Sequence, residues 1–118
     1  MDRDEGLIRF LRERTGECLR GVGRYDADGY EVLYVRPGLE RETLDSEVER
    51  MVTHLRSESR PREVRSFPYG DLDGTVRSFE EAVVMHFPLT QERGVVVTLE
   101  PDVARQLTTF MRECIERL

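Results

Sequence analysis

Residues 82–99 read Ala-Val-Val-Met-His-Phe-Pro-Leu-Thr-Gln-Glu-Arg-Gly-Val-Val-Val-Thr-Leu, and they decide the fold together with the segment that follows, residues 101–118. The apolar residues alternate with a period of two on both sides of a polar turn, which predicts two antiparallel strands joined in a hairpin. In the second segment the apolar residues recur at helical spacing and form one stripe: Val103, Leu107, Phe110, Met111, Cys114, Ile115 and Leu118. We therefore expect a long helix packed on the hairpin, with Phe110 buried against Phe87 and Val97.

The rest of the chain predicts two earlier helices and further strands. Helices are expected over residues 4–15 and within residues 40–59, and strands over residues 17–25, 29–36 and 75–79, with a weaker strand over residues 62–69. Apolar residues of both parities occur in these strands, so both faces of the sheet need cover. We expect one α+β domain over residues 1–118. Its antiparallel sheet of about five strands should carry the first and last helices on one face and the middle helix on the other.

Two resemblances follow from these elements. The order α-β-β-α-β-β-β-α, with helices on both faces, resembles the profilin-like layout shared by roadblock and longin domains and, more loosely, by PAS and GAF sensors. Separately, Tyr-Asp-Ala-Asp-Gly-Tyr-Glu-Val-Leu-Tyr-Val-Arg at 25–36, Thr-Val-Arg-Ser-Phe-Glu-Glu-Ala-Val at 75–83 and His-Phe-Pro-Leu at 86–89 are similar to a family of small uncharacterised haloarchaeal proteins. The first resemblance implies a topology only. The second implies a halophilic source and carries no activity.

The charge composition is unusual. All 18 basic residues are arginine, there is no lysine, and 24 acidic residues give a net charge of −6. Such a surface suits molar salt, where a Debye length of about 3 Å screens the repulsion between carboxylates. A GC-rich genome, whose codons favour arginine, is the competing explanation. The acidic balance argues against nucleic-acid binding, which depends on cationic contacts with phosphate.

The sequence also predicts a location. No apolar run approaches the ~20 residues of a membrane span, so we expect no membrane partner. The polar, acidic N-terminus, Met-Asp-Arg-Asp-Glu-Gly, does not have the pattern of a secretory signal. Cys18 and Cys114 lie far apart and form no Cys-x-x-Cys motif. We therefore expect a cytoplasmic protein with reduced thiols.

Two patterns suggest a metal and are better explained otherwise. If the middle helix covers the face that carries His86, then His54, His86 and Cys18 form a possible three-ligand set, but a hydrogen-bonded core histidine is the more common case. The Asp-x-Asp-Gly pattern occurs at residues 26–29 and 71–74, where aspartate and glycine also suit turns for backbone reasons. We expect no bound metal or cofactor, although loose association of K⁺ or Na⁺ is compatible with either interpretation.

Two further sets of residues are candidates for binding. Arg20, Arg24, Arg65 and Arg77 alternate along predicted strands and, if they share a face, form a cationic strip that can hold an anion such as phosphate or a nucleotide. Arginines paired with neighbouring carboxylates are the favoured alternative. Tyr30, Val32 and Tyr34 share one parity of the strand at residues 29–36, which predicts an edge strand that serves as an interface, because tyrosine is enriched there.

The sequence contains no catalytic constellation that we recognise, and we expect no enzyme. There is no nucleophile elbow, no phosphate loop and no carboxylate pair at helical spacing toward a cleft. We expect a non-enzymatic interaction module, either a homodimer or a subunit that docks on another protein. The alternative is a PAS- or GAF-like sensor domain for a small ligand or an anion, which requires an enclosed pocket between the sheet and a helix.

Overall fold

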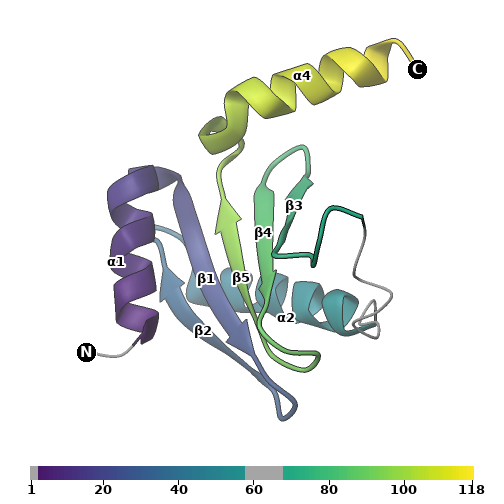
Figure 1. Ribbon diagram of the computed structural model, residues 1–118. Coiled ribbons are helices and arrows are strands. Elements are labelled where there is room, and N and C mark those ends of the chain that lie inside the picture. Colours follow the sequence, from purple (N-terminus) through teal and green to yellow (C-terminus); the bar gives the residue numbers. More distant parts are fainter. Residues whose placement is uncertain (1–2, 58–67) are drawn as a thin grey trace.

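The computed structural model describes residues 3–57 and 68–118 and shows an α+β fold (Figure 1). In chain order the elements are α1 (Arg3–Thr15), the 3-10 turn η1 (Gly16–Cys18), β1 (Leu19–Tyr25), β2 (Tyr30–Val35), α2 (Arg41–Ser57), β3 (Thr75–Ser78), β4 (Val83–Pro88), β5 (Gly94–Leu99), the 3-10 turn η2 (Pro101–Ala104) and α4 (Arg105–Glu116). The predicted fold class is confirmed. The weak strand predicted over residues 62–69 lies almost wholly outside the described residues.

The sheet has five antiparallel strands in the order β2-β1-β5-β4-β3. The two predicted hairpins, β1–β2 and β4–β5, stand side by side because β1 also pairs with β5. This arrangement makes β5 the central strand, and all six of its residues are buried. Among the strands that the structure describes, β2 and β3 lie at the two edges.

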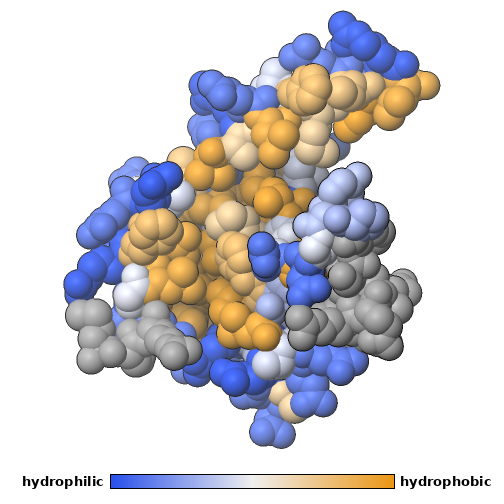
Figure 2. Space-filling view, viewed as in Figure 1, coloured by the Kyte–Doolittle hydropathy of each residue, from blue (hydrophilic) through white to orange (hydrophobic). Residues whose placement is uncertain are grey.

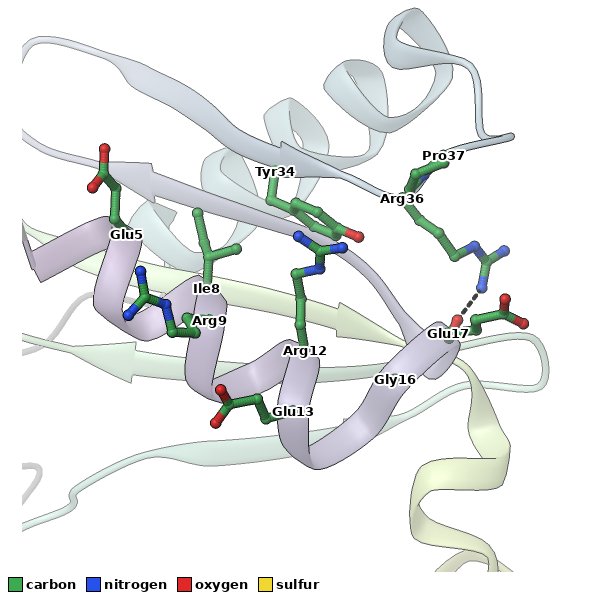
Figure 3. Close-up of a pocket in the computed structure, with 10 residues that line it drawn as sticks. All are labelled: Glu5, Ile8, Arg9, Arg12, Glu13, Gly16, Glu17, Tyr34, Arg36 and Pro37. Atoms are coloured by element: carbon green, nitrogen blue, oxygen red, sulfur yellow. Dashed lines mark hydrogen bonds between the residues drawn. The ribbon is translucent and has the colours of Figure 1, made fainter.

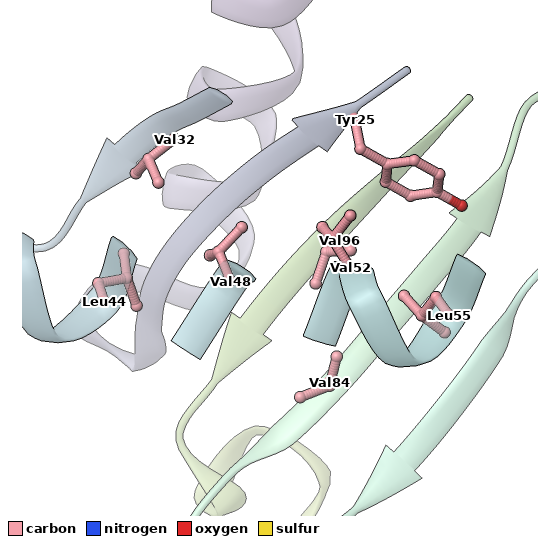
Figure 4. Close-up of a cluster of buried hydrophobic side chains, with 8 residues drawn as sticks. All are labelled: Tyr25, Val32, Leu44, Val48, Val52, Leu55, Val84 and Val96. Atoms are coloured by element: carbon pink, nitrogen blue, oxygen red, sulfur yellow. The ribbon is translucent and has the colours of Figure 1, made fainter. Parts of the chain in front are cut away.

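One face of the sheet, the back face, is covered by α2 as expected. The buried stripe of this helix packs on side chains from four strands (Figure 4), and the cluster comprises Leu44, Val48, Val52 and Leu55 with Tyr25, Val32, Val84 and Val96. Gly21 and Gly23 of β1 face the helix, and a Cβ atom at Gly21 would lie 2.2 Å from Leu44 Cδ2. Glycine is therefore needed at this position so that α2 can approach the strand closely.

This close approach gives a stability prediction. Gly21→Ala forces the buried Leu44 side chain to move, and overpacking of this kind typically costs about 1–3 kcal/mol. Leu44→Ala leaves a cavity instead and is expected to cost about 2–5 kcal/mol. The double variant should be more stable than the sum of the two changes predicts, because the new methyl group fills part of that cavity. Urea unfolding of all four proteins measures the coupling, and strict additivity would contradict the contact.

The opposite face, the front face, is covered in part by α1. Leu11 is buried there, with Leu7 and Ile8 packed beside it, over a cluster formed by Leu19, Val22, Val83, Val95, Val97 and Leu99. The first and middle helices thus lie on opposite faces of the sheet, as the apolar residues of both strand parities predicted.

The last helix does not lie on the sheet, and this part of the prediction is wrong. Figure 1 shows α4 extending away from the end of β5. It has no buried residue, and Phe110 is 63% exposed although Val97 is fully buried. The chain changes direction at the turn before α4, where Ala104 at φ −123° and ψ 34° interrupts the helical path between η2 and α4. An apolar stripe predicts that one side of a helix packs against another surface, but it does not specify which surface that is.

Candidate functional site

The predicted arginine strip is divided between the two faces of the sheet. Arg20 makes a bidentate contact with Glu47 of α2, at 3.0 and 3.3 Å, on the back face. Arg24 donates to Asp4 of α1, at 2.7 Å, on the front face. Arg77 pairs in register with Val84, whose side chain lies under α2, and Arg65 lies outside the described residues. The structure thus gives Arg20 and Arg24 carboxylate partners on different helices and does not bring them together.

The three predicted interface residues of β2 do not share one face, because Tyr34 lies on the front face and Tyr30 and Val32 lie on the back face. The strand is at an edge of the sheet, but its register shifts where Val22 pairs with Tyr34 and Gly23 with Val32, so that one residue of β2 is passed over. Val32 is therefore buried under α2, whereas the Tyr34 ring lies against α1 with the Arg12 guanidinium 5.5 Å from its centre. A bulge of this kind breaks the parity on which the prediction relied.

Tyr30 is held on the back face by a hydrogen bond. Its hydroxyl donates to Asp45 Oδ2 of α2 at 2.9 Å. This bond raises the pKa of Tyr30 above its usual range, and desolvation and the negative charges of Asp45 and Glu49 act in the same direction. The residue thus ties β2 to α2.

The raised pKa gives a prediction for alkaline solution. Because the folded state holds the Tyr30 proton more tightly than the unfolded chain, whose tyrosines titrate near pH 10, this stabilisation is present below that pH. It is lost as the pH rises through the folded-state pKa. Asp45→Asn should lower the pKa of Tyr30 by removing the charged acceptor. Tyrosinate absorbance, with Tyr30→Phe to identify the step, measures this, and an unchanged titration in Asp45→Asn would contradict the assignment.

The histidines and the thiol do not form a metal site. Tyr25 and His86 share a hydrogen bond of 2.7 Å between the hydroxyl and Nε2, with their rings stacked, whereas His54 is on an exposed part of α2 and Cys18 is in η1. Within residues 3–57 and 68–118, no three histidine, cysteine, aspartate or glutamate side chains are grouped so that they can hold a metal ion. The Asp26 carboxylate accepts bonds from the backbone of Asp28 and Gly29, as a turn residue does.

The described surface includes two broad grooves that are open to solvent. The first, of ≈ 1070 Å³, lies between α1 and β2, and its walls carry three arginines and three glutamates (Figure 3): Arg9, Arg12 and Arg36 with Glu5, Glu13 and Glu17. Arg36 at its end donates to the Glu17 carbonyl oxygen at 2.7 Å and pairs with Glu100 at 3.0 Å. Charges of both signs line this groove in equal number, so it has no bias toward an anion.

The second groove, of ≈ 1010 Å³, lies between α2 and the β3–β4 turn. Its lining includes Arg20, Arg50, His54 and Phe79, and the buried hydroxyl of Thr98 at its floor lies 3.5 Å from the Gly21 carbonyl oxygen. It is the feature closest to the pocket that a sensor needs, but it is an open groove and not an enclosed cavity.

The third candidate for binding consists of two exposed apolar surfaces. We define the α4 stripe as the exposed apolar residues on one side of η2 and α4: Val103, Leu107, Phe110, Met111 and Ile115. We define the open sheet face as the part of the front face that α1 leaves uncovered: Val76, Met85 and Phe87. Ile115 is 60% and Val76 57% exposed. Figure 2 shows hydrophobic atoms along α4 and on the sheet beside α1, both on the same side of the molecule.

The α4 stripe was predicted correctly from the sequence, but the surface on which it was expected to pack was wrong. Leu107, Phe110 and Ile115 were expected in the core and are instead candidates for binding. The open sheet face was missed as a site, although Met85 and Phe87 carry the signal, since they continue the front-face parity of the buried Val83 beyond the area covered by α1. In the described part of the chain no helix has the length and apolar character needed to cross a membrane.

Comparison with known proteins gives a family and no activity. No curated protein matches the sequence. A family described as a domain of unknown function, DUF7522, matches residues 5–118, which is almost the whole chain. The chain therefore belongs to the DUF7522 family.

Proposed function

We propose that this protein is a non-enzymatic interaction module that assembles through the α4 stripe and the open sheet face, as a homodimer or as a subunit docked on another protein. The observation that carries the proposal is the exposure of a regular apolar stripe on a helix that has no buried residue. Apolar patches of this kind on a folded protein mark surfaces for protein interaction.

The helix itself supports the same conclusion. α4 has 12 residues, and isolated helices shorter than about 12–15 residues are marginal in water. Most helix stability in proteins comes from packing an amphipathic face, and fully burying a leucine, isoleucine or phenylalanine side chain is worth about 1.5–3 kcal/mol. A partner that covers the α4 stripe therefore supplies the stabilisation that its own domain does not provide.

The experiment is photo-crosslinking in the native host. A benzophenone amino acid is placed at Phe110, and the matched control carries it at Thr109, which lies on the polar side of the same helix. We expect the probe at position 110 to form a specific protein adduct, identified by mass spectrometry, and the probe at position 109 to form little or none. Absence of an adduct at position 110, with the variant folded and expressed, would contradict the proposal.

The alternative function is a sensor of a small ligand or anion, and the groove between α2 and the β3–β4 turn supports a small ligand. Arg20 and Arg50 supply positive charge there, but Arg20 is paired with Glu47. The groove is also lined by Glu40, Glu42 and Glu81, so its charge does not favour an anion. Thermal unfolding in the presence of inorganic phosphate or nucleotides tests this alternative, because a ligand that binds only the folded state raises the midpoint.

We also propose a haloarchaeal origin, a cytoplasmic location and a profilin-like topology. The absence of lysine and the net charge of −6 support the first. The free cysteines, Cys18 and Cys114, support the second. The order of helices and strands supports the third, although the outward position of α4 departs from a layout in which the last helix covers the sheet.

A further inference from the structure

The α4 stripe and the open sheet face are complementary in kind. α4 is an amphipathic helix without a sheet, and the open sheet face is an apolar sheet surface without a helix. Val76 pairs in register with Met85, and Met85 belongs to the cluster under α1, so Val76 continues the same face out to the edge strand β3. An α-helix laid beside α1 would complete the cover of this face.

The base of α4 is fixed in a position from which it does not reach this surface. The Glu100 amide donates to the Cys18 carbonyl oxygen at 2.8 Å, and the Glu100 carboxylate pairs with Arg36 at 3.0 Å and with Arg20 at 3.7 Å. Ala104 then packs against the front cluster. Folding α4 back onto its own sheet requires this turn to be rebuilt, whereas a helix from another molecule reaches the sheet with the turn unchanged.

We propose that two copies of this chain exchange their last helices, so that the α4 stripe of each copy covers the open sheet face of the other. This inference rests on the proposed function and names its partner. Both surfaces face the same side of the molecule (Figure 2), so a two-fold axis can bring each helix onto the other sheet. In a symmetric dimer of this kind, the α4 stripe and the open sheet face of both copies are buried. Exchange of an identical element is a low-cost route to a dimer.

A dimer formed by this exchange contains two identical contacts, each between the helix of one copy and the sheet of the other. Each contact can therefore be damaged from either of its two sides. A copy with a damaged helix still has an intact sheet, and a copy with a damaged sheet still has an intact helix. Each damaged protein alone has no intact contact, but a mixture of the two can form a heterodimer with one. We therefore expect complementation between variants of the two surfaces.

The test uses the full-length chain in two variants, Phe110→Glu on α4 and Val76→Glu on β3, with Thr109→Glu as a control that adds the same charge to the polar side of α4. We expect wild type and the control to sediment as dimers. Each variant alone should dissociate at least about tenfold more readily, and mixing the two should restore a dimer. Both changed residues are more than half exposed, and Met85→Glu provides a second sheet variant if Val76→Glu does not fold.

Each of the other outcomes contradicts the exchange of helices, and they differ in whether they also contradict the proposed function. A dimer that survives Val76→Glu and Met85→Glu but not Phe110→Glu indicates pairing between helices. A wild-type chain that is monomeric at all concentrations, together with an adduct to a different protein from the probe at position 110, leaves the proposed function standing and excludes the exchange. A monomer with no adduct at position 110 contradicts both.

Discussion

The midpoint of thermal unfolding is expected to rise by more than about 5 °C as KCl is increased from about 0.05 M to about 2 M, which corresponds to about 1 kcal/mol at the midpoint. The chain has 24 acidic residues against 18 arginines. In dilute buffer the Debye length is about 30 Å at 0.01 M, so each surplus carboxylate is repelled by the others across the domain. The folded state concentrates this repulsion and the unfolded chain relieves it.

The control for the salt prediction is a domain of similar size and near-neutral charge, whose midpoint should rise less. Acidification to about pH 4, where carboxylates approach their ordinary pKa values, should partly replace the effect of salt. Ion pairs such as that between Arg20 and Glu47 work against this replacement, because they stabilise the folded state only while both groups are charged. A midpoint that stays level or falls across the KCl series would contradict a halophilic origin and leave codon usage as the explanation for the missing lysine.

The second large effect concerns protein concentration. If the copies exchange α4, wild-type stability includes a binding contribution that grows with concentration, about 2.7 kcal/mol at one hundred times the dissociation constant. Phe110→Ala should remove much of that contribution. In the dilute, monomeric protein the same change should alter the free energy of unfolding by no more than about 0.5 kcal/mol, as for other surface positions, because Phe110 is 63% exposed.

Urea unfolding at low and high protein concentration measures this difference, with Thr109→Ala as the matched control on the polar side of α4. A phenylalanine buried in its own domain would instead cost about 3–5 kcal/mol on truncation to alanine. A loss of that size in the dilute protein would show that α4 packs on its own sheet in solution, and it would contradict the arrangement proposed here.

Local periodicity predicted the elements and most of the core. The alternation of Val83 with Met85 and of Val95 with Val97 identified the two strands of the last hairpin, and the stripe containing Val48 and Val52 identified the helix that covers the back face. These predictions succeeded because the side-chain period of a strand or helix is a local property of the sequence.

The positions of the binding residues were less accessible from sequence. The prediction that Tyr30, Val32 and Tyr34 share a face failed at one bulge, which turns Tyr34 toward α1 and leaves Val32 under α2. Likewise, the spacing of Arg20 and Arg24 contains no information about Glu47 and Asp4, which come from different helices. The direction of α4 depends on the backbone at Ala104, which no periodicity reports.

Hydrogen–deuterium exchange across a protein concentration series tests the central claim, that α4 and the open sheet face cover each other between copies. We predict that the amides of α4 and of β3 become more protected as the concentration rises, whereas those of α2, already packed on the back face, do not change. In Phe110→Glu the rise should disappear. Protection of α4 that is equal at all concentrations would contradict the account.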